Sequence, residues 1–373
     1  MEPIHYLQLI GGLALLVAGA EALVRGASRL AALFGISPLI IGLTIVALGT
    51  SSPEIAVSVT AAVKGSTGVT LGNVIGSNIA NVLLILGAAA VITPLLVAQR
   101  LVRLDVPIMI GISLVVVFLA LDGQLGRIDG VVLVCGLLVY IAFQVKKARE
   151  EMPRVEKEYE KEFGLPRQHT GAQTALSVLG IAVGLTLMVF GSRWLVDGAS
   201  AAARALGVGE FVIGITVVAL GTSLPELVTS ILAAIQRQKD IAVGNIIGSN
   251  IYNLLAVLGI SSLSASGIGI EVSRQVLQFD LPVMVAVAVA CLPIFFRNYR
   301  INRLEGFVFL GYYVAYITYL VLKATDSRAI PTFDFIMLAF VLPLTAFSLG
   351  IITWRSVWRS WKHSRVTTRR GPA

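Results

Sequence analysis

The sequence contains few of the residues that carry most enzyme and metal chemistry. Among 373 residues there are 2 cysteines and 3 histidines, and only 13% of the residues are charged. Such a small set of scattered cysteines and histidines excludes a zinc cage. Cys135 and Cys291 both fall in apolar stretches, where we expect small buried side chains and no disulfide. The low charge also excludes an ordinary soluble domain.

Apolar residues make up 56% of the chain, and the mean hydropathy is +0.87. This composition is typical of an integral membrane protein, in which each spanning helix needs about 20 apolar residues. Residues 7–24 lack a basic start and a cleavage site, so we interpret them as part of the first span rather than a signal peptide. The apolar stretches predict an all-α polytopic membrane protein with spans near 5–24, 38–62, 71–94, 104–121, 128–145, 173–194, 209–235, 243–265, 278–296, 303–322 and 332–353.

The basic residues predict the orientation of these spans. If the N-terminus is outside, 22 of the 29 lysines and arginines fall in segments on the cytoplasmic side. The positive-inside rule therefore favours a plasma-membrane protein with the N-terminus outside and the C-terminus in the cytoplasm. The same distribution accounts for the net charge of +8 without nucleic acid as a partner.

A block of 46 residues occurs twice, 172 positions apart and without a gap. Residues 42–87 and 214–259 are identical at 24 of the 46 aligned positions, and both carry the motifs GTS-x-PE and GN-x-IGSN. Five spans separate the starts of the two copies, so the second copy is inverted across the membrane. We therefore expect two inverted five-helix repeats, ten spans in all, with a shared site near the midplane where they meet, and an eleventh span after them.

These observations divide the chain into five parts. They are the first repeat (1–148), a cytoplasmic linker (149–172), the second repeat (173–323), the extra span (324–353) and a basic cytoplasmic tail (354–373).

Both copies place a glutamate, Glu54 or Glu226, inside an otherwise apolar helix. An ionised carboxylate at membrane depth costs at least about 2.5 kcal/mol, so such a residue indicates a functional site. The spacing i, i+4 places Thr50 on the helix face of Glu54 and Thr222 on the helix face of Glu226. The same spacing relates Ser77 to Asn81 and Ser249 to Asn253, and Ser51 and Ser223 add hydroxyl groups.

Each glutamate follows a proline, Pro53 or Pro225, which removes a backbone N–H and clashes with the carbonyl four residues earlier. We expect freed carbonyls at 47–50 and 219–222. Carboxylate, hydroxyl, amide and carbonyl oxygens are hard ligands that suit calcium, sodium or protons. Two carboxylates balance one divalent cation, two sodium ions or two protons, and these states exclude one another as exchange requires. The small residues Gly72, Gly76, Gly244 and Gly248 predict close helix packing beside the site.

At these motifs the chain resembles the cation/calcium exchanger superfamily, and the short linker makes it most similar to prokaryotic members. The resemblance implies a four-helix core built from spans 2, 3, 7 and 8, with spans 1 and 6 sliding over it. It implies that Glu54 and Glu226 bridge calcium and that Thr50 and Thr222 contribute carbonyls. The flanking sodium sites would be lined by Ala47, Ser51, Ser77, Ala219, Ser223 and Ser249, with Asn81 and Asn253 at the centre.

Some sodium- and potassium-coupled relatives carry an aspartate where this chain has Asn253, which leaves the coupling ion open. We interpret the protein as a secondary active antiporter that exchanges calcium for sodium by alternating access, with a proton-coupled exchanger as the alternative. A passive channel is a weaker alternative. An enzyme is the weakest, since the sequence offers no nucleophile or cofactor motif. We expect no cofactor and no protein partner, only the bilayer and the transported ions.

Two pairs of opposite charges lie one helical turn apart, at equivalent positions of the two repeats. Glu21 precedes Arg25 in the first, and Arg193 precedes Asp197 in the second. We predict a local ion pair in each case; a gating role on the sliding helices is the alternative. Tryptophans of the tail are expected to anchor it at the membrane edge.

Overall fold

A computed structural model describes residues 3–163, 171–206, 219–296, 299–325 and 327–337. The elements in chain order are α1 (Pro3–Phe34), α2 (Pro38–Ile41), η1 (Gly42–Val46), α3 (Ala47–Thr50), α4 (Ser52–Val63), α5 (Thr67–Ala80), η2 (Asn81–Leu86), α6 (Gly87–Ile92), β1 (Leu95–Leu96), η3 (Leu101–Asp105), α7 (Val106–Leu119), η4 (Ala120–Asp122), β2 (Gln124–Leu125), α8 (Arg127–Phe163), α9 (Gly171–Ala205), α11 (Ala219–Gly221), α12 (Leu224–Ile235), α13 (Lys239–Tyr252), η6 (Asn253–Val257), α14 (Leu258–Ser264), β3 (Ile270–Glu271), η7 (Val276–Asp280), α15 (Leu281–Phe296), β4 (Arg300–Ile301), α16 (Arg303–Ala324) and α17 (Ile330–Ile336).

The chain is a mostly helical, multi-pass membrane protein. Eight helices in the described ranges are long and apolar enough to cross a membrane, or nine if the bent pair Pro38–Thr50 and Ser52–Val63 forms one span. These helices lie at the positions of the spans expected from the sequence, apart from those at 209–235 and 332–353. Parts of these two, residues 209–218 and 338–353, lie outside the described residues, as does the tail. Helices α1 and α9 are longer than expected, since α1 continues past residue 24 to Phe34 and α9 continues past residue 194 to Ala205.

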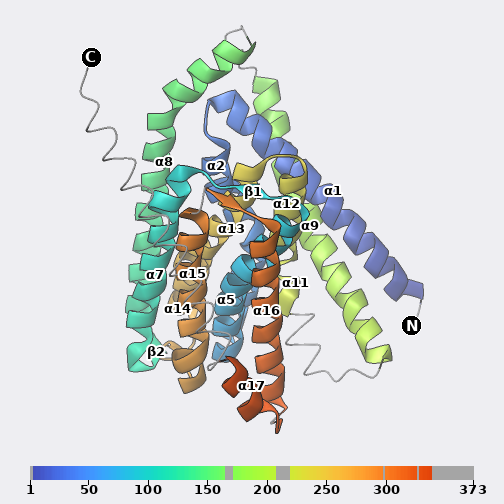
Figure 1. The fold of residues 1–373 in the computed structure, drawn as a ribbon, viewed down its shortest axis with the longest axis vertical. Coiled ribbons are helices and arrows are strands. Elements are labelled where there is room, and N and C mark those ends of the chain that lie inside the picture. The colour runs from blue at the N-terminus through green and yellow to red at the C-terminus, as the bar shows by residue number, and fades with distance from the viewer. Residues whose placement is uncertain (1–2, 164–170, 207–218, 297–298, 326, 338–373) are drawn as a thin grey trace.

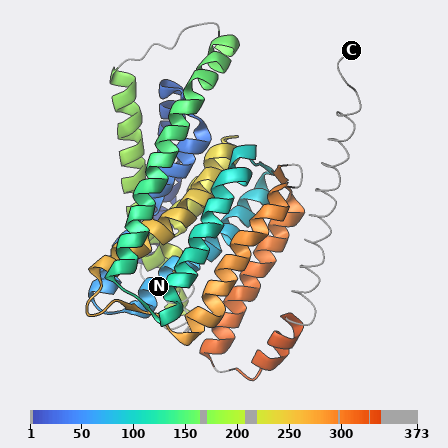
Figure 2. The ribbon, with the colours of Figure 1, turned by 90° about the vertical axis from the view of Figure 1, so that its left-hand side faces the viewer.

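Two expectations about span ends and cysteines are wrong. The fifth span was expected to end near residue 145, but α8 continues as one helix to Phe163, and Figure 2 shows it extending beyond the ends of α7, α15 and α16. Cys135 was expected to be buried but is exposed, whereas Cys291 is buried; both are free thiols.

Four two-residue strands form two short antiparallel ladders between loops that are far apart in the sequence. β1 pairs with β4 through Leu95 and Ile301, and β2 pairs with β3 through Leu125 and Ile270. Each ladder joins a loop of the predicted first repeat to a loop of the predicted second repeat. These backbone hydrogen bonds therefore fasten the two halves together at their loops.

Helices α1 and α9 pack against each other along their lengths and slant together along one side of the molecule (Figure 1). Glycines spaced seven residues apart allow this contact. A Cβ atom on Gly19 would lie 2.7 Å from the carbonyl oxygen of Gly184, and one on Gly191 would lie 2.8 Å from that of Gly12. Backbone thus meets backbone directly, as is common where helices associate in lipid.

Helix α13 lies at the centre of the fold and contacts η1, α2, α3 and α12. All residues of α13 from Ile241 to Tyr252 are buried, so the polar side chains of this stretch face protein rather than lipid. Gly244 and Gly248 permit close packing as predicted, since a Cβ on Gly248 would lie 2.9 Å from the Leu43 carbonyl oxygen. Among the residues that the structure places, none lies as close to Gly72 or Gly76.

Candidate cation site

The second span is broken beside its glutamate. Helix α3 ends at Thr50, α4 begins at Ser52, and the two segments meet at an angle of 44°. Ser51 at the break has φ −80° and ψ 4°, and Pro53 lies in the first turn of α4. Contrary to the prediction from their spacing, Thr50 and Glu54 therefore do not share a face of one helix, because the two residues lie on different segments.

The second copy has the same break. Helix α11 ends at Gly221 and α12 begins at Leu224, with Ser223 between them at φ −87° and ψ 4°. Pro225 again lies in the first turn of the new helix. A proline is tolerated there because the first N–H groups of a helix have no partner within it.

The carbonyls that the prolines displace from helical bonding are those of Gly49 and Gly221, four residues before each proline. Both are satisfied by a serine. The Ser52 hydroxyl donates to the Gly49 oxygen at 2.5 Å, and the Ser192 hydroxyl of α9 donates to the Gly221 oxygen. The carbonyl of Ala47 accepts the Ser51 N–H at 3.0 Å. The carbonyls of Gly49 and Gly221 thus bind serine hydroxyls in place of helical N–H groups, whereas the carbonyl of Ala47 keeps its helical bond.

Each break places its glutamate in the first turn of a helix, Glu54 in α4 and Glu226 in α12. The positive end of the helix dipole stabilises a negative charge at this position. Both residues are buried, with 0% and 1% of their surface exposed. The broken helices thus lower the cost of holding two carboxylates away from water.

Serines of each copy bind the glutamate of the other copy. The Ser51 hydroxyl donates to Glu226 Oε1 at 3.0 Å, and the Ser223 hydroxyl donates to Glu54 Oε1 at 3.2 Å. Ser249 lies 3.5 Å from the same Glu226 oxygen, and Ser77 lies 3.0 Å from the Ser223 hydroxyl. Each glutamate is therefore surrounded by hydroxyl groups that come from both copies of the motif.

The threonines are held by asparagines on the neighbouring copy. The Thr50 hydroxyl donates to Asn245 Oδ1 at 3.1 Å, and the Thr222 hydroxyl donates to Asn73 Oδ1 at 3.0 Å. The two amide nitrogens bind serines in turn, at 3.0 Å from Asn245 to Ser230 and at 2.8 Å from Asn73 to Ser58. These bonds use the threonine hydroxyls as donors and fix the turns whose carbonyls are the candidate ligands.

Asn81 and Asn253 are oriented by two further asparagines. Asn81 Nδ2 donates to Asn250 Oδ1, and Asn253 Nδ2 donates to Asn78 Oδ1, both at 3.0 Å. Asn81 and Asn253 each open a π-helical segment, η2 and η6. Since the amide nitrogens are engaged, the orientation of both carbonyl oxygens is fixed.

Methionines of α7 and α15 complete these amide contacts. Asn250 Nδ2 lies 3.4 Å from Met109 Sδ, and Asn78 Nδ2 lies 3.7 Å from Met284 Sδ. A thioether is a weak acceptor. These contacts hold Asn78 and Asn250 in place without adding a charged group near Asn81 and Asn253.

Four buried oxygens of the site have no hydrogen-bond partner: Glu54 Oε2, Glu226 Oε2, Asn81 Oδ1 and Asn253 Oδ1. In the part of the chain that the structure describes, no lysine, arginine or histidine forms an ion pair with either glutamate. Buried polar atoms are nearly always satisfied. Four orphaned acceptors, two of them carboxylate oxygens, have the chemistry of a site for a cation.

The predicted site residues mostly lie together. One set of hydrogen bonds connects Glu226 with Ser51 and Ser249, and Ser249 with Thr50. A second set connects Glu54 with Ser223, and Ser223 with Ser77. Thr222 joins the second set through Asn73, whose amide also donates to the backbone carbonyl of Glu54, whereas Asn81 and Asn253 lie in separate asparagine contacts. Ala47 contributes a carbonyl beside Thr50, whose hydroxyl lies 3.3 Å from it, and Ala219 is the first residue of α11.

The residue-level predictions omitted the supporting asparagines Asn73, Asn78, Asn245 and Asn250. All four lie inside the duplicated GN-x-IGSN motif, so their identity in both copies was a usable signal. Met109 and Met284 lie outside the duplicated block. Only the short pattern D-x-P-x-M, which begins at Asp105 and again at Asp280, marks them in the sequence.

The chain is similar to membrane exchangers over most of its length. A family described as sodium/calcium exchanger protein matches residues 4–146 and 176–322. The inner membrane protein YrbG of Escherichia coli K12 is 41% identical over 283 residues, covering 75% of this chain and 85% of that protein. The sodium/calcium exchanger MaX1 of Methanosarcina acetivorans is 32% identical over 351 residues, covering 86% and 99%. A solved structure of the sodium-calcium exchanger NCX_Mj soaked with Na⁺ and Ca²⁺ superposes with a TM-score of 0.73 at 31% identity, covering 85% of this chain and 99% of that one.

The Ser192 contact leads to a stability prediction. Ser192→Ala leaves the buried Gly221 carbonyl without its donor, so the free energy of unfolding should fall by about 1–3 kcal/mol. Thr186→Ala is the control, because the Thr186 hydroxyl is exposed and donates within its own helix, to Ala182. Thermal unfolding of both variants in detergent measures the difference. An equal effect of the two substitutions would contradict the assigned role of Ser192.

Proposed function

This chain belongs to the sodium/calcium exchanger protein family, and from that premise we propose that Glu54 and Glu226 together hold the calcium ion that it transports. The protein exchanges calcium across the membrane by antiport. Calcium is its substrate and not a resident cofactor. The assignment of ligands and of the counter-ion rests on the chemistry of the site.

The four unpartnered oxygens carry this proposal. Glu54 Oε2, Glu226 Oε2, Asn81 Oδ1 and Asn253 Oδ1 are buried acceptors that lack a donor. Calcium prefers oxygen ligands from carboxylates, amides and backbone carbonyls. Two carboxylates give the ligand set a charge of −2, which one calcium ion neutralises. The carbonyls of Thr50 and Thr222 complete the proposed ligand set.

We propose sodium as the counter-ion, bound in flanking sites by Ala47, Ser51, Ser77, Ala219, Ser223 and Ser249. Four of these residues supply the hydroxyls gathered around the two glutamates. Helix α3 also directs its C-terminal end toward the break, and such ends of discontinuous helices coordinate sodium or protons in other transporters. Proton coupling is the alternative, with the same two carboxylates as carriers.

Alternating access follows from the charge of the site. When calcium or two sodium ions bind, both carboxylates are neutralised, and movement of the site past an apolar barrier costs less. An empty site with two negative charges resists this movement, which enforces exchange over leak. In this scheme α1 and α9 slide together over the core, and their glycine contacts keep them joined as one unit.

The proposed architecture assigns one five-helix repeat to 1–148 and an inverted one to 173–323. Residues 149–172 connect them on the cytoplasmic side, 324–353 form an additional span, and 354–373 a cytoplasmic tail. The reciprocal bonds between Ser51 and Glu226 and between Ser223 and Glu54 support this duplication. The N-terminus lies outside in this arrangement.

Substitution of either glutamate tests the calcium site. Glu54→Gln and Glu226→Gln preserve shape but remove a charge, so each should abolish calcium uptake into proteoliposomes while the protein still inserts. Glu271→Gln, on an exposed strand residue, is the matched control and should transport normally. Calcium flux at the wild-type rate in either site variant would refute the assignment.

Imposed gradients identify the counter-ion. At a fixed membrane potential, an outward sodium gradient should drive calcium uptake by the reconstituted protein, and an outward proton gradient should not. Uptake driven by protons alone would replace sodium with protons in the proposal. Calcium flux that needs no ion on the opposite side would instead indicate a channel.

A further inference from the structure

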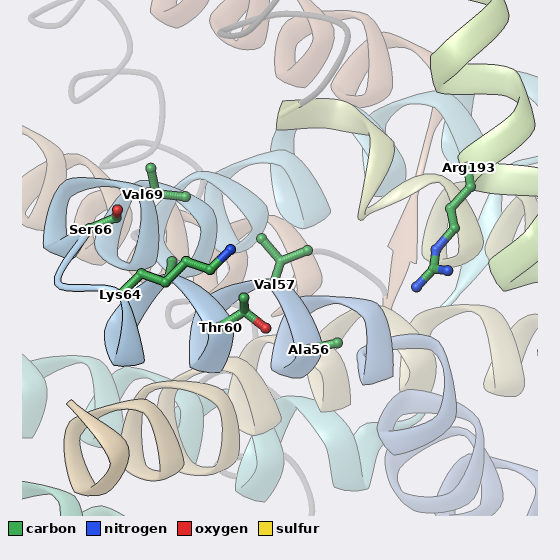
Figure 3. A pocket seen from close by; sticks show the side chains of 8 residues that line it. Ala56, Val57, Thr60, Lys64, Ser66, Val69 and Arg193 are labelled. Carbon is green, nitrogen blue, oxygen red and sulfur yellow. The ribbon is translucent and has the colours of Figure 1, made fainter. Parts of the chain in front are cut away.

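A groove of about 420 Å³ lies between the turn that joins α4 to α5 and the long helix α9. Its lining includes Lys64 and Arg193, the hydroxyl residues Thr60 and Ser66, and apolar residues such as Val57. Figure 3 shows the side chains of Lys64 and Arg193 extending toward each other from separate elements, with Val57 between them. No part of the cation site lines this groove.

The two basic side chains of the groove have no acidic partner among the residues placed by the structure. The lining contains no aspartate or glutamate. Of the two ion pairs predicted from the sequence, that of Glu21 with Arg25 is confirmed, whereas Arg193 forms none with Asp197 in the described ranges. Two exposed, unpaired cations beside one cavity create a local positive potential.

The start of α5 adds further hydrogen-bond donors. Ser66 is its N-cap residue, and its side chain makes no capping bond. Ser66 and Val69 both line the groove, so the first turn of this 14-residue helix borders it. The N-terminus of a helix favours anions through its free N–H groups and its dipole. The two cations, the hydroxyl groups and the helix N-terminus therefore all favour an anionic ligand.

This arrangement is not part of the duplicated cation site. At the same offset of 172 residues, Gln236 corresponds to Lys64, and Glu21 corresponds to Arg193. The second copy thus has no pair of cations at the equivalent place. In the proposed orientation Lys64 and Arg193 are also among the few basic residues outside, where the positive-inside rule does not favour them.

We propose that this groove binds the phosphate group of a phospholipid in the outer leaflet. Lys64 and Arg193 would contact the phosphate, assisted by the Ser66 hydroxyl and the start of α5. Val57 and Val69, which are 39% and 54% exposed, would contact the glycerol and acyl chains. A free phosphate ion would use the cations but leave these apolar side chains uncovered, so the lipid fits the lining better.

A bound lipid would connect two parts of the molecule. Lys64 is the C-cap residue of α4, which carries Glu54, whereas Arg193 belongs to α9. If α9 slides as the proposed function requires, the lipid would slow exchange by holding α9 to α4. Lipid binding itself does not depend on that function and is measured separately.

Native mass spectrometry of the full-length protein with phosphatidylglycerol tests the site. The double variant Lys64→Gln, Arg193→Gln should weaken the binding of one lipid about thirtyfold, because it removes the two positive charges that attract the lipid headgroup. The control is Arg127→Gln, Arg274→Gln, which removes two exposed arginines outside the groove and should leave that lipid bound. Lys64→Arg, Arg193→Lys keeps the charges and should also retain it.

The proposal is overturned if the groove and control variants lose lipid equally, or if neither does. A titration with inorganic phosphate distinguishes the two sources of the ligand. If inorganic phosphate binds to the groove and phosphatidylglycerol does not, the lipid assignment is wrong. If the thermal unfolding midpoint falls equally in all variants, their loss of lipid reflects destabilisation. In that case the charge-conserving variant decides: retention of the lipid supports the proposal, and loss of the lipid overturns it.

Discussion

The cost of taking a carboxylate out of water is the constraint on which this structure depends, and it acts twice, at Glu54 and Glu226. Such a group is tolerated only where charges, dipoles or hydrogen bonds replace its hydration. Here each carboxylate lies at the start of a helix and accepts a bond from a serine of the opposite copy. These contacts reach one oxygen of each carboxylate, and the other oxygen has no partner within the described protein. The transported cation supplies the remaining stabilisation in our account.

The broken helices and the duplication are two consequences of the same requirement. A break creates the helix start that stabilises each carboxylate. The carbonyl that proline displaces then accepts a hydrogen bond from a serine, Ser52 in one copy and Ser192 in the other. Because the serine donors cross between the copies, neither copy alone completes the surroundings of its own glutamate. The asparagine pairs repeat this arrangement, so residues of the proposed cation site also hold the two copies together.

Much of this site could be predicted from the sequence, because ionisable residues are costly at membrane depth and are rarely found there outside functional sites. The glutamates and serines of the two motifs do contact each other across the copies. The break after Thr50 could not be located, since proline predicts that a helix is disturbed but not where its segments end. Ser192, Met109 and Met284 lie outside the duplicated block and reach it through tertiary packing alone. The length of α8 was not predicted, because hydropathy marks only the apolar part of a helix and α8 continues beyond its apolar part.

Anomalous diffraction from calcium-soaked crystals of the full chain tests the central claim most directly. We expect a calcium peak bonded to Glu54 Oε2 and Glu226 Oε2 at about 2.3–2.6 Å. We also expect Asn81 and Asn253 to keep their amide nitrogens on Asn250 and Asn78. A well-occupied calcium peak elsewhere, with none between the two carboxylates, would contradict it.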